Sequence, residues 1–593
     1  MYQDFSAKTS PETGAPRLAA LRERLALSGL DAFVVPRADA WQGEYVTEAD
    51  ARLAWLTGFT GSAGFCIAMR DRAGVFVDGR YRVQVRAEVD LSVYTPVNWP
   101  ETQPGTWLME ALPQGGRVGF DPWMHTRAQI EEIARALDGS GIELIESPNL
   151  VDAIWPDRPA PACAPARLHP LAFAGESSAD KRRRLGAALG VPAAVLTLPD
   201  SICWLLNIRG ADVPRNPIVQ AFAILHADGR VALFADPRKF DADLTAALGP
   251  EVEILPLERF EDVLSALSGP VMVDPATAPL AVWSTLDGET VAGGDPCILP
   301  KAQKNPAEIA GMEAAHLRDG AAMVEFLHWV DMNAPQGTLT EIDVVTALEG
   351  FRRARGATDI SFDTICGAGP NGAIVHYRVN ERTNRRVTPG EILLVDSGAQ
   401  YPDGTTDITR TLAVGPVPEE TREPFTRVLR GTIAIARARW PRGLSGRDLD
   451  ALARAPLWAA GLDYDHGTGH GVGAALCVHE GPARISRISE IPLAPGMILS
   501  DEPGYYREGA FGIRLENLVL VEEAPPLGDA HRRMLAFRNL TWVPFDTRLL
   551  APELLSGEER AWLNAYHAEV LTRIGPLVGA EAAAWLATAC RAV

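Results

Sequence analysis

Two carboxylates flank a predicted tight turn in the stretch LLVDSGAQYPDGTTDITRT, residues 393–411. Asp396 ends an apolar run, Asp407 opens the next alternating run, and the Tyr-Pro-Asp-Gly sequence at 401–404 has turn-forming composition. This pattern predicts a β-hairpin that brings the two acids close together. Two like charges at short range repel each other and lose solvation, so the pair favours a bound cation or a protonated carboxyl.

Histidines are concentrated in the same part of the chain. The stretch HGTGHGVGAALCVHEGP, residues 466–482, places His466, His470 and His479 among glycines. Glycines at this density disfavour a helix and are typical of backbone that lies against a ligand or a neighbouring strand. His376 precedes them in the loop-like AGPNGAIVHYRVNER.

Two glutamates flank a second predicted hairpin in ILSDEPGYYREGAFGIRLENLVLVEE, residues 498–523. Glu502 follows an apolar run, and Glu516 is embedded in GIRLENLVLV, which predicts a strand. A carboxylate inside so apolar a strand is costly unless it is paired or binds a metal. Each of these acids alone would be typical of solvated surface charge.

Together, the acids and one imidazole form a coherent set of metal ligands: Asp, Asp, His, Glu and Glu. Two divalent cations would balance the carboxylate charges and leave room for one bridging hydroxide. Ligation rich in oxygen, with a single nitrogen and no thiolate, favours manganese, cobalt or a similar ion over structural zinc. Two such ions about 3.5–4 Å apart ionise a bridging water at neutral pH and clamp a tetrahedral intermediate. The residues alone therefore indicate a dimetal hydrolase.

The segments with this chemistry all lie in the third of three sequence blocks. Linkers at 156–170 and around 295–309 separate the blocks. The third block opens on a predicted helix in which Asn305 is the N-cap, Pro306 is the first helical residue and Glu308 is the N3 partner. The first two blocks are therefore expected to position or gate the site rather than to carry it.

The first two blocks share a pattern that predicts an internal duplication. Each has an apolar strand before a W-L-x4-G motif, which is WLTGFTG at 55–61 and WLLNIRG at 204–210. In each, a later strand ends in an aspartate shortly before an arginine. Helical stretches alternate with the strands, so both blocks are expected to be small α/β domains.

Composition limits the classes of protein that remain. The chain has 593 residues and a formal net charge of −20, and we find no long basic run, which argues against a nucleic-acid surface or an anionic membrane patch. The seven cysteines are scattered without a CxxC pair, as expected for reduced thiols. The sequence lacks a signal-like apolar segment and an apolar run of roughly 20 residues. We therefore expect a cytoplasmic protein.

On these motifs the sequence resembles the pita-bread metallopeptidases, which include methionine aminopeptidases, prolidases and aminopeptidase P. The likeness is strongest to the long, three-domain, cytosolic type of aminopeptidase P. It extends to DGRYRVQ, WLLNIRG, KNPAEIAGMEAAHLRDGAA and the tail LTWVPFDTRLLAPELLSGEERAWLNAYHAEV, residues 540–570. The resemblance implies an α/β (α+β) fold with creatinase-like α/β domains at 1–157 and 158–300, a pita-bread catalytic domain at 301–540, and a C-terminal extension at 541–593 packed on it.

The resemblance also implies a role for each candidate residue. Asp396 would bind one metal, Asp407 and Glu516 would bridge both, and His470 and Glu502 would hold the second. Glu502 would also carry a proton from the bridging water to the leaving proline nitrogen. The other implied roles are hydrogen bonds to the substrate near the scissile bond for His376 and His479, a place near the proline pocket for His466, and bracing of a ligand carboxylate for Arg514.

The implied activity is release of the N-terminal residue from peptides with proline in the second position, by attack of a hydroxide that bridges two divalent metal ions. Mn²⁺ is the first expectation, and Co²⁺ or Zn²⁺ are the alternatives. Proline in that position gives a tertiary amide with no N–H and a rigid ring, so a fitted pocket and proton delivery to its nitrogen are needed. The expected partners are such peptides and a second copy of the chain in a homodimer, with no nucleic acid and no membrane.

Other interpretations remain open. A prolidase would use the same five ligands on X-Pro dipeptides, although the resemblance to prolidases lacks the two N-terminal blocks and the tail. A metal-free pita-bread binding module, or a creatinase-type hydrolase of C–N bonds, predicts eroded ligand positions. A structural metal site would usually close the coordination shell and would not explain the extra histidines.

Overall fold

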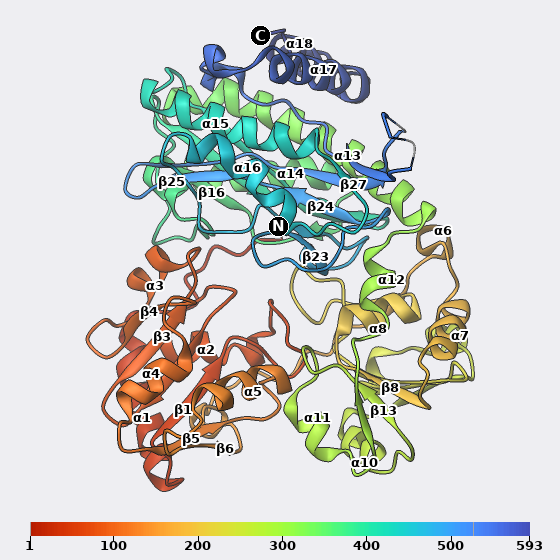
Figure 1. Cartoon of the computed structure of the whole chain (residues 1–593). Coiled ribbons are helices and arrows are strands. Elements are labelled where there is room, and N and C mark those ends of the chain that lie inside the picture. The colour runs from red at the N-terminus through yellow and green to blue at the C-terminus, as the bar shows by residue number, and fades with distance from the viewer. Residues whose placement is uncertain (1, 526, 530) are drawn as a thin grey trace. The chain divides into compact units, whose positions relative to one another are not determined.

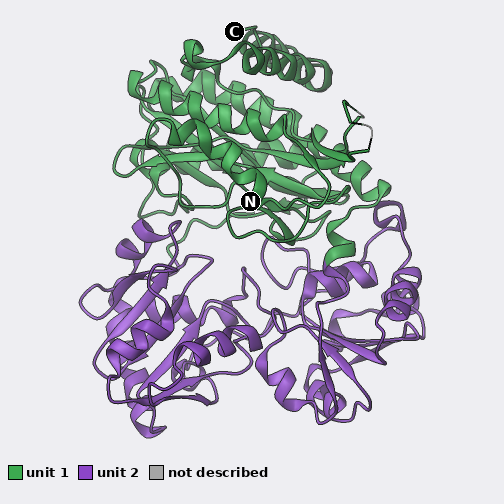
Figure 2. Ribbon diagram, in the orientation of Figure 1, with its two compact units in different colours: residues 1–7, 299–593 green, residues 8–298 purple. Residues whose placement is uncertain are grey.

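The computed structural model describes residues 2–525, 527–529 and 531–593, and the chain clusters into two compact units (Figures 1 and 2). Unit 1 contains the described residues up to Ala7 and those from Leu299 to Val593, and unit 2 contains Lys8–Ile298. This clustering is coarser than the four domains expected from the sequence, whose boundaries stay a prediction. No helix among the described residues is long and apolar enough to cross a membrane.

Unit 2 contains two six-stranded mixed sheets with the same strand order. The first sheet runs β4 (Thr95–Asn98), β3 (Ala73–Val77), β2 (Phe65–Met69), β1 (Ala32–Pro36), β5 (Gly116–Phe120) and β6 (Ile142–Glu146). The second runs β12 (Val252–Leu255), β11 (Val231–Phe234), β10 (Phe222–His226), β8 (Ala193–Leu196), β13 (Val271–Val273) and β14 (Thr290–Ala292). In both sheets the third strand of this order is antiparallel to the fourth, and the fourth is parallel to the fifth. The predicted duplication is confirmed.

The turns that follow β5 and β13 join the two halves of unit 2. Thr126 caps helix α5 (Arg127–Ala136) and also forms an isolated bridge with Pro279, next to helix α11 (Leu280–Thr285). The Leu280 N–H donates to the carbonyl of His125 at 2.8 Å. Corresponding turns of the duplicated sheets therefore meet through backbone hydrogen bonds.

Two antiparallel sheets of unit 1 carry the candidate site residues. The three-stranded sheet runs β16 (Ile365–Ala368), β17 (Ile392–Ser397) and β20 (Ile408–Ala413). The six-stranded sheet runs β21 (Arg439–Pro441), β28 (Met534–Asn539), β27 (Asn517–Glu523), β24 (Ile498–Asp501), β22 (Gly469–Gly471) and β23 (Glu480–Ile485). Two short hairpins extend from these strands: β18 (Ala399–Tyr401) with β19 (Gly404–Thr405), and β25 (Gly504–Arg507) with β26 (Phe511–Arg514).

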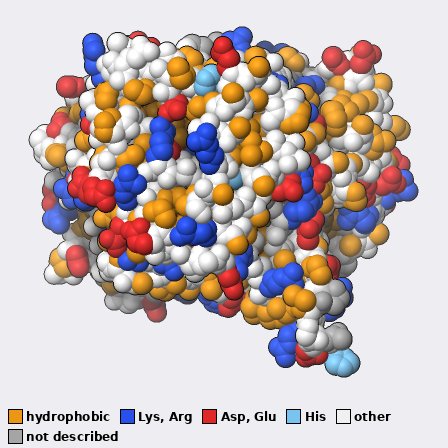
Figure 3. Space-filling view, turned by 90° about the horizontal axis from the view of Figure 1, so that it is seen from above, with side chains coloured by type: hydrophobic (Ala, Val, Ile, Leu, Met, Phe, Trp, Pro, Cys, Tyr) orange, Lys and Arg blue, Asp and Glu red, His pale blue; other side chains and the backbone are white. Residues whose placement is uncertain are grey.

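Long helices surround these sheets. They are α13 (Pro306–Asn333), α14 (Glu341–Ala354), α15 (Glu419–Ala436), α16 (Arg447–Trp458), α17 (Gly557–Ile574) and α18 (Ala580–Ala589). The predicted start of α13 is confirmed: the Asn305 side chain accepts from the Glu308 N–H, and the Glu308 carboxylate accepts from the Asn305 N–H. Phe425 of α15, Val570 of α17 and Leu586 of α18 share one buried core. Figure 3 shows the end of unit 1 that α17 and α18 cover, where acidic, basic and apolar side chains are interspersed.

Residues that precede unit 2 in the sequence are built into unit 1, as the shared colour in Figure 2 shows. The Tyr2 N–H donates to Glu349 Oε1 at 2.6 Å. The Gln3 side chain accepts from the Thr364 N–H at 2.9 Å, and the Phe5 carbonyl accepts from the Glu381 N–H at 2.9 Å. Residues 2–5 therefore contact α14 and the loop that contains His376.

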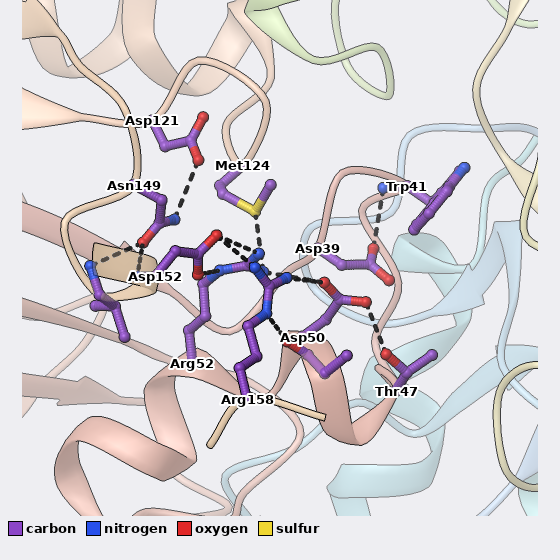
Figure 4. A network of polar contacts seen from close by, with 12 residues as sticks. Asp39, Trp41, Thr47, Asp50, Arg52, Asp121, Met124, Asn149, Asp152 and Arg158 are labelled. Atoms are coloured by element: carbon purple, nitrogen blue, oxygen red, sulfur yellow. Dashed lines mark hydrogen bonds and ion pairs between the residues drawn. The ribbon is translucent and has the colours of Figure 1, made fainter. Parts of the chain in front are cut away.

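A network of ion pairs ties helix α2 (Arg52–Thr57) to the segment that ends the first block (Figure 4). Arg52 makes a two-pronged contact with Asp152, at 2.7 and 3.0 Å, and reaches Asp50 at 3.1 Å. Arg158 donates to Asp152 at 2.7 Å and lies 3.4 Å from Asp50. Asp50 and Asp152 are thus matched by two guanidinium groups.

Candidate metal centre

Asp396 and Asp407 lie on neighbouring strands of the three-stranded sheet. β17 pairs with β20 in a register that sets Asp396 opposite Thr409, and Asp407 directly precedes β20. The predicted turn at 401–404 closes the β18–β19 hairpin between them. Both aspartates are buried, with 7% and 3% of their surface exposed. The predicted hairpin is therefore confirmed, and it is extended by this second, smaller hairpin at its tip.

Three further candidate ligands reach the same place from the six-stranded sheet. His470 lies on β22, Glu502 directly follows β24 and Glu516 directly precedes β27. Asp407 Oδ2 and Glu502 Oε1 each lie 3.5 Å from His470 Nε2. One potential ligand atom from each of Asp407, His470 and Glu516 lies within 4.8 Å of the others.

The prediction that Glu516 lies inside a strand is wrong in detail. Residues 515–516 separate β26 from β27. At this point the chain leaves its hairpin partner β25 and begins to pair with β24. The Glu516 N–H donates instead to the carbonyl of Thr409 on β20, at 3.1 Å. This change of partner draws Glu516 to the strand that follows Asp407.

The ring of His470 is oriented by the backbone carbonyl of the next residue, Gly471. His470 Nδ1 lies 3.0 Å from the carbonyl oxygen of Gly471. A carbonyl oxygen can only accept, so Nδ1 carries a proton in this bond and Nε2 is the nitrogen left available to a metal. Nε2 is the atom that faces Asp407 and Glu502. His470 is thereby prepared to ligate a metal through Nε2.

The carboxylates of this cluster repel one another, and the resulting pKa shifts favour forms with less negative charge. Burial and the charges of Asp407 and Glu502 raise the pKa of Asp396 to about 6, even though the Arg514 guanidinium opposes this shift. Burial and the neighbouring carboxylates raise the pKa of Glu516 well above its ordinary value. Burial alone would lower the pKa of His470, but contact with Asp407 and Glu502 raises it to about 9. Each shift favours the form that reduces the negative charge of the cluster.

The donor set fits a pair of divalent metals. Asp396 Oδ1, Asp407 Oδ1 and Glu516 Oε1 are buried and have no hydrogen-bond partner among the described residues. Buried carboxylate oxygens without partners are costly unless a cation binds them. The opposite oxygens of two of these acids are held in place: Arg514 donates to Asp396 Oδ2 at 2.6 Å, and Thr409 donates to Glu516 Oε2 at 2.7 Å. The arrangement is that of metal ligands fixed by outer partners.

Arg514 connects the metal centre to a predicted substrate residue. Its guanidinium donates to the Tyr506 hydroxyl at 2.6 Å, as well as to Asp396. The Tyr506 oxygen lies 2.9 Å from His466 Nε2. Because the hydroxyl accepts from Arg514, its own proton is directed to His466. His466 Nδ1 lies 2.7 Å from the Gly467 carbonyl, which is consistent with an accepting Nε2.

The other two predicted substrate histidines lie near the same cluster. The His479 ring meets the His470 ring edge to face, with centroids 4.3 Å apart. His376 directly follows Val375, whose carbonyl accepts from Arg514 at 3.2 Å. The structure therefore links all of the candidate residues by direct contact, or through one neighbour, within unit 1.

The loop with His376 is held by a buried acid that no local sequence pattern predicts. Glu341, at the start of α14, is fully buried. It accepts from the Ala368 N–H at 2.8 Å, the Tyr377 hydroxyl at 2.9 Å and the Arg385 N–H at 3.1 Å. These bonds span the whole loop, so Glu341 sets the position of the segment around His376.

Two buried lysines pair with Glu480, the residue that follows His479 in the chain. The Glu480 carboxylate contacts Lys301 at 3.1 Å and also contacts Lys304. All three side chains are at most 2% exposed. Both lysines lie in the linker that enters the third block, a region whose pattern predicted only a helix start. Lys304 belongs to the Lys-Asn-Pro motif at the helix start, so the motif itself is visible in the sequence. No neighbouring residue indicates that its partner is Glu480.

The family relationship agrees with this geometry. The chain matches the Metallopeptidase family M24 over residues 310–523 and the C-terminal region of peptidase M24 over residues 533–593. It matches the Creatinase/Prolidase N-terminal domain twice, over residues 17–154 and 157–308. Fold and site therefore define an M24 metallopeptidase with two creatinase-type N-terminal domains.

Full-length relatives narrow this class. The chain is 40% identical to aminopeptidase P2 of Arabidopsis thaliana, over 94% of this chain and 85% of the relative. It is 39% identical to a probable Xaa-Pro aminopeptidase P of Neosartorya fischeri, over 95% and 90% of the two chains. The chain belongs to the Xaa-Pro aminopeptidase P family.

The comparison with solved structures agrees with this family assignment. An X-prolyl aminopeptidase from Caenorhabditis elegans, described as a cytosolic enzyme with a di-nuclear active site, matches with a TM-score of 0.93 and 34% identity, over 98% of this chain and 100% of that chain. The Xaa-Pro dipeptidase of Bacillus anthracis matches with a TM-score of 0.50 and 24% identity, over 62% of this chain and 98% of its own. The second likeness shows a shared fold alone.

Proposed function

We propose that this chain is a metal-dependent aminopeptidase that releases the N-terminal residue from peptides with proline in the second position. The observation that carries this proposal is the buried convergence of carboxylates, three of which present an oxygen without a described partner. The relationship to proteins named Xaa-Pro aminopeptidase, which extends over nearly the whole chain, supports the substrate class.

Two divalent metal ions would be held by the five ligands predicted from the sequence. Asp396 would bind one ion, His470 and Glu502 the other, and Asp407 and Glu516 both. The distances of 3.5 Å from His470 Nε2 to Asp407 and Glu502 support this grouping. Oxygen-rich ligation favours Mn²⁺, with Co²⁺ or Zn²⁺ as alternatives. When bound, the ions would supply Lewis-acid activation of water and of the scissile carbonyl.

Glu502 would move the proton. A general base must be within reach of both the attacking water and the leaving nitrogen. The Glu502 side chain is 18% exposed, whereas that of Asp407 is 4% exposed. Of these two carboxylates, Glu502 is the one that a substrate can approach. It would accept a proton from water and donate it to the proline nitrogen, which needs that proton to leave as an amine.

The histidines would orient the peptide. His479, against the ring of His470, and His376, in the loop held by Glu341, would donate hydrogen bonds to the substrate near the scissile bond. His466 would line the proline pocket, with its ring fixed by Tyr506. The proline amide has no N–H, so recognition would depend on the ring and on carbonyl oxygens.

We also propose a cytoplasmic location and a homodimer. The location follows the description of the C. elegans enzyme as cytosolic. Exposed apolar side chains on unit 1 support self-association: Trp458 at the end of α16 is 46% exposed and Ile488 is 77% exposed. The guanidinium of Arg487, the residue before Ile488, lies 5.9 Å from the centre of the Trp458 ring, and exposed apolar side chains of this kind are typical of association surfaces.

Hydrolysis of two matched substrates tests the proposal. Purified protein is assayed on Arg-Pro-Pro and on the dipeptide Arg-Pro, first after chelation and then after Mn²⁺ is restored. We expect Mn²⁺-dependent release of arginine from the tripeptide, and we expect Glu502→Gln to abolish it. Turnover of the dipeptide alone would assign the chain as a prolidase. Absence of turnover together with absence of bound metal would overturn the proposal and leave a pita-bread binding module.

A further inference from the structure

Ser500 lies between two of the predicted metal ligands. It is fully buried on β24, two residues before Glu502. Its hydroxyl oxygen accepts from the backbone N–H of His470 at 2.9 Å, and the hydroxyl donates to Glu502 Oε1 at 3.1 Å. Because a serine hydroxyl has one proton, the bond from His470 leaves that proton for the Glu502 carboxylate.

The bond from His470 replaces part of a regular strand ladder. β22 runs antiparallel to β24, with Gly471 opposite Leu499. The Val472 N–H donates to the Ile498 carbonyl at 3.0 Å, and the Glu502 N–H donates to the Thr468 carbonyl at 2.8 Å. In this register His470 and Ser500 form the pair in between, where the N–H would ordinarily find a backbone carbonyl. Here the His470 N–H donates to the Ser500 hydroxyl oxygen instead, so the hydroxyl has a fixed orientation.

Ser500 contacts only one of the two Glu502 oxygens. That oxygen, Oε1, is also the one that lies 3.5 Å from His470 Nε2. Two ligand atoms at one metal ion lie roughly 3–3.5 Å apart when each metal–ligand bond is about 2.0–2.2 Å long. Oε1 is therefore the oxygen placed on the metal side, and the hydrogen bond from Ser500 is made to Oε1 and not to Oε2.

We propose that Ser500 is a positioning residue that gives the two oxygens of Glu502 different tasks. Its hydrogen bond holds Oε1 beside His470 for metal binding and leaves Oε2 for the proton. A rotation of the carboxylate out of this orientation would break the bond, so each turnover begins with one oxygen beside His470 and the other available as the base. The inference rests on the proposed function and adds a residue to it.

Two substitutions separate the hydroxyl from the volume of the side chain. Ser500→Ala removes the donor, and Ser500→Thr keeps it. We expect Ser500→Ala to weaken binding of the second Mn²⁺ about 10- to 100-fold, the range typical for outer partners of metal ligands. At saturating Mn²⁺ we expect kcat on Arg-Pro-Pro to fall about 10-fold or more, with KM changed less than about 3-fold, because the loss affects the base rather than substrate binding. Ser500→Thr is expected to restore both.

Mn²⁺ titration followed by the EPR signal of the free ion measures the affinity without any turnover. Ser397→Ala is the matched control, because Ser397 is also fully buried beside a predicted ligand but its hydroxyl has no hydrogen-bond partner among the described residues. We expect it to bind Mn²⁺ like the wild type.

Two results would overturn the inference: wild-type Mn²⁺ affinity and kcat in Ser500→Ala, or a loss that Ser500→Thr does not restore. If the wild type cleaves neither peptide, the proposed function fails. The Mn²⁺ titration of the three variants still decides the role of Ser500 in that case.

Discussion

The two units of the molecule each gather acidic side chains, but they neutralise them differently. In unit 2, Asp50 and Asp152 are contacted by Arg52 and Arg158, so these two carboxylates of Figure 4 have counter-charges from neighbouring side chains. In unit 1, the four carboxylates of the metal centre meet one guanidinium, that of Arg514, and one imidazole. Both clusters consist of acidic side chains near basic ones, but the metal centre has fewer basic side chains for each carboxylate.

This difference identifies which acidic cluster is built for a ligand. A cluster that contains its own arginines is complete as folded, and its arginines hold the backbone in place. A buried cluster with too few cations remains unfavourable until metal ions bind. Three oxygens without described partners occur in the second kind of cluster: Asp396 Oδ1, Asp407 Oδ1 and Glu516 Oε1.

The largest expected effect comes from changing the charge of the metal centre itself. Asp407→Asn keeps the shape of the side chain but removes one negative charge from a predicted bridging position. We expect kcat/KM on Arg-Pro-Pro to fall about 10³-fold or more, equivalent to about 4 kcal/mol, together with loss of at least one Mn²⁺. Metal analysis and steady-state kinetics check this. Asp529→Asn, at an exposed position, is the control, and normal activity of Asp407→Asn would contradict the comparison.

A smaller effect is expected when the self-neutralised network is broken. Arg52→Met removes the guanidinium that contacts both aspartates, and its side chain is only 6% exposed. We expect unit 2 to lose about 2–4 kcal/mol of stability, because Arg158 remains as a partner. Urea unfolding followed by hydrogen exchange of unit 2 peptides measures this.

The same experiment has two internal checks. The exposed pair of Arg230 with Asp228 provides the control Arg230→Met, for which we expect a change below about 0.5 kcal/mol. Mn²⁺ stoichiometry is expected to stay at the wild-type value in Arg52→Met, because Asp50 and Asp152 pair with arginines and are not among the predicted metal ligands. A loss of bound Mn²⁺ would show that the two clusters are not independent.

The smallest expected effect is a pH dependence of the metal-free protein. The pKa of Asp396 is raised to about 6, above the ordinary value of about 3.9. The folded state therefore binds more protons than the unfolded state in this window, so stability falls as pH rises from about 4 to about 6. The expected change is about 2–3 kcal/mol, from about 1.4 kcal/mol for each pKa unit.

Urea unfolding of chelated protein at several pH values measures this slope. We expect Asp396→Asn to flatten it, because the variant has no carboxyl to titrate there. We also expect Mn²⁺ to reverse the slope, since metal ions bind the ionised carboxylate and compete with protons. An equal slope in Asp396→Asn and wild type would attribute the effect to other groups.

Much of the site was predictable because its signals are local. The turn between Asp396 and Asp407, the glycines around His470 and the capping box at Asn305 all depend on neighbours within a few residues. The duplication in unit 2 was visible because each copy repeats its own local motifs.

The parts that sequence reasoning missed depend on contacts between distant segments. Lys304 meets Glu480 across 176 residues, and Arg514 meets Asp396 across 118. The position of Glu516 was misjudged because its strand changes partners, and the choice of partner is set by the sheet rather than by the residues beside it. The role of Ser500 has the same origin, since only the pairing of β22 with β24 shows that its hydroxyl faces His470.

The placement of residues 2–5 in unit 1 has a consequence for the order in which the protein folds during synthesis. These residues are synthesised before unit 2, yet Tyr2 finds its partner Glu349 only 347 residues later. Unit 2, residues 8–298, is complete by then and can form its sheets while residues 2–5 still lack their partners. Glu381, beside the loop with His376, emerges later still and closes on Phe5. Residues 2–5 thus reach their native contacts only after unit 2 has been synthesised, and the metal centre is assembled after the unit that precedes it.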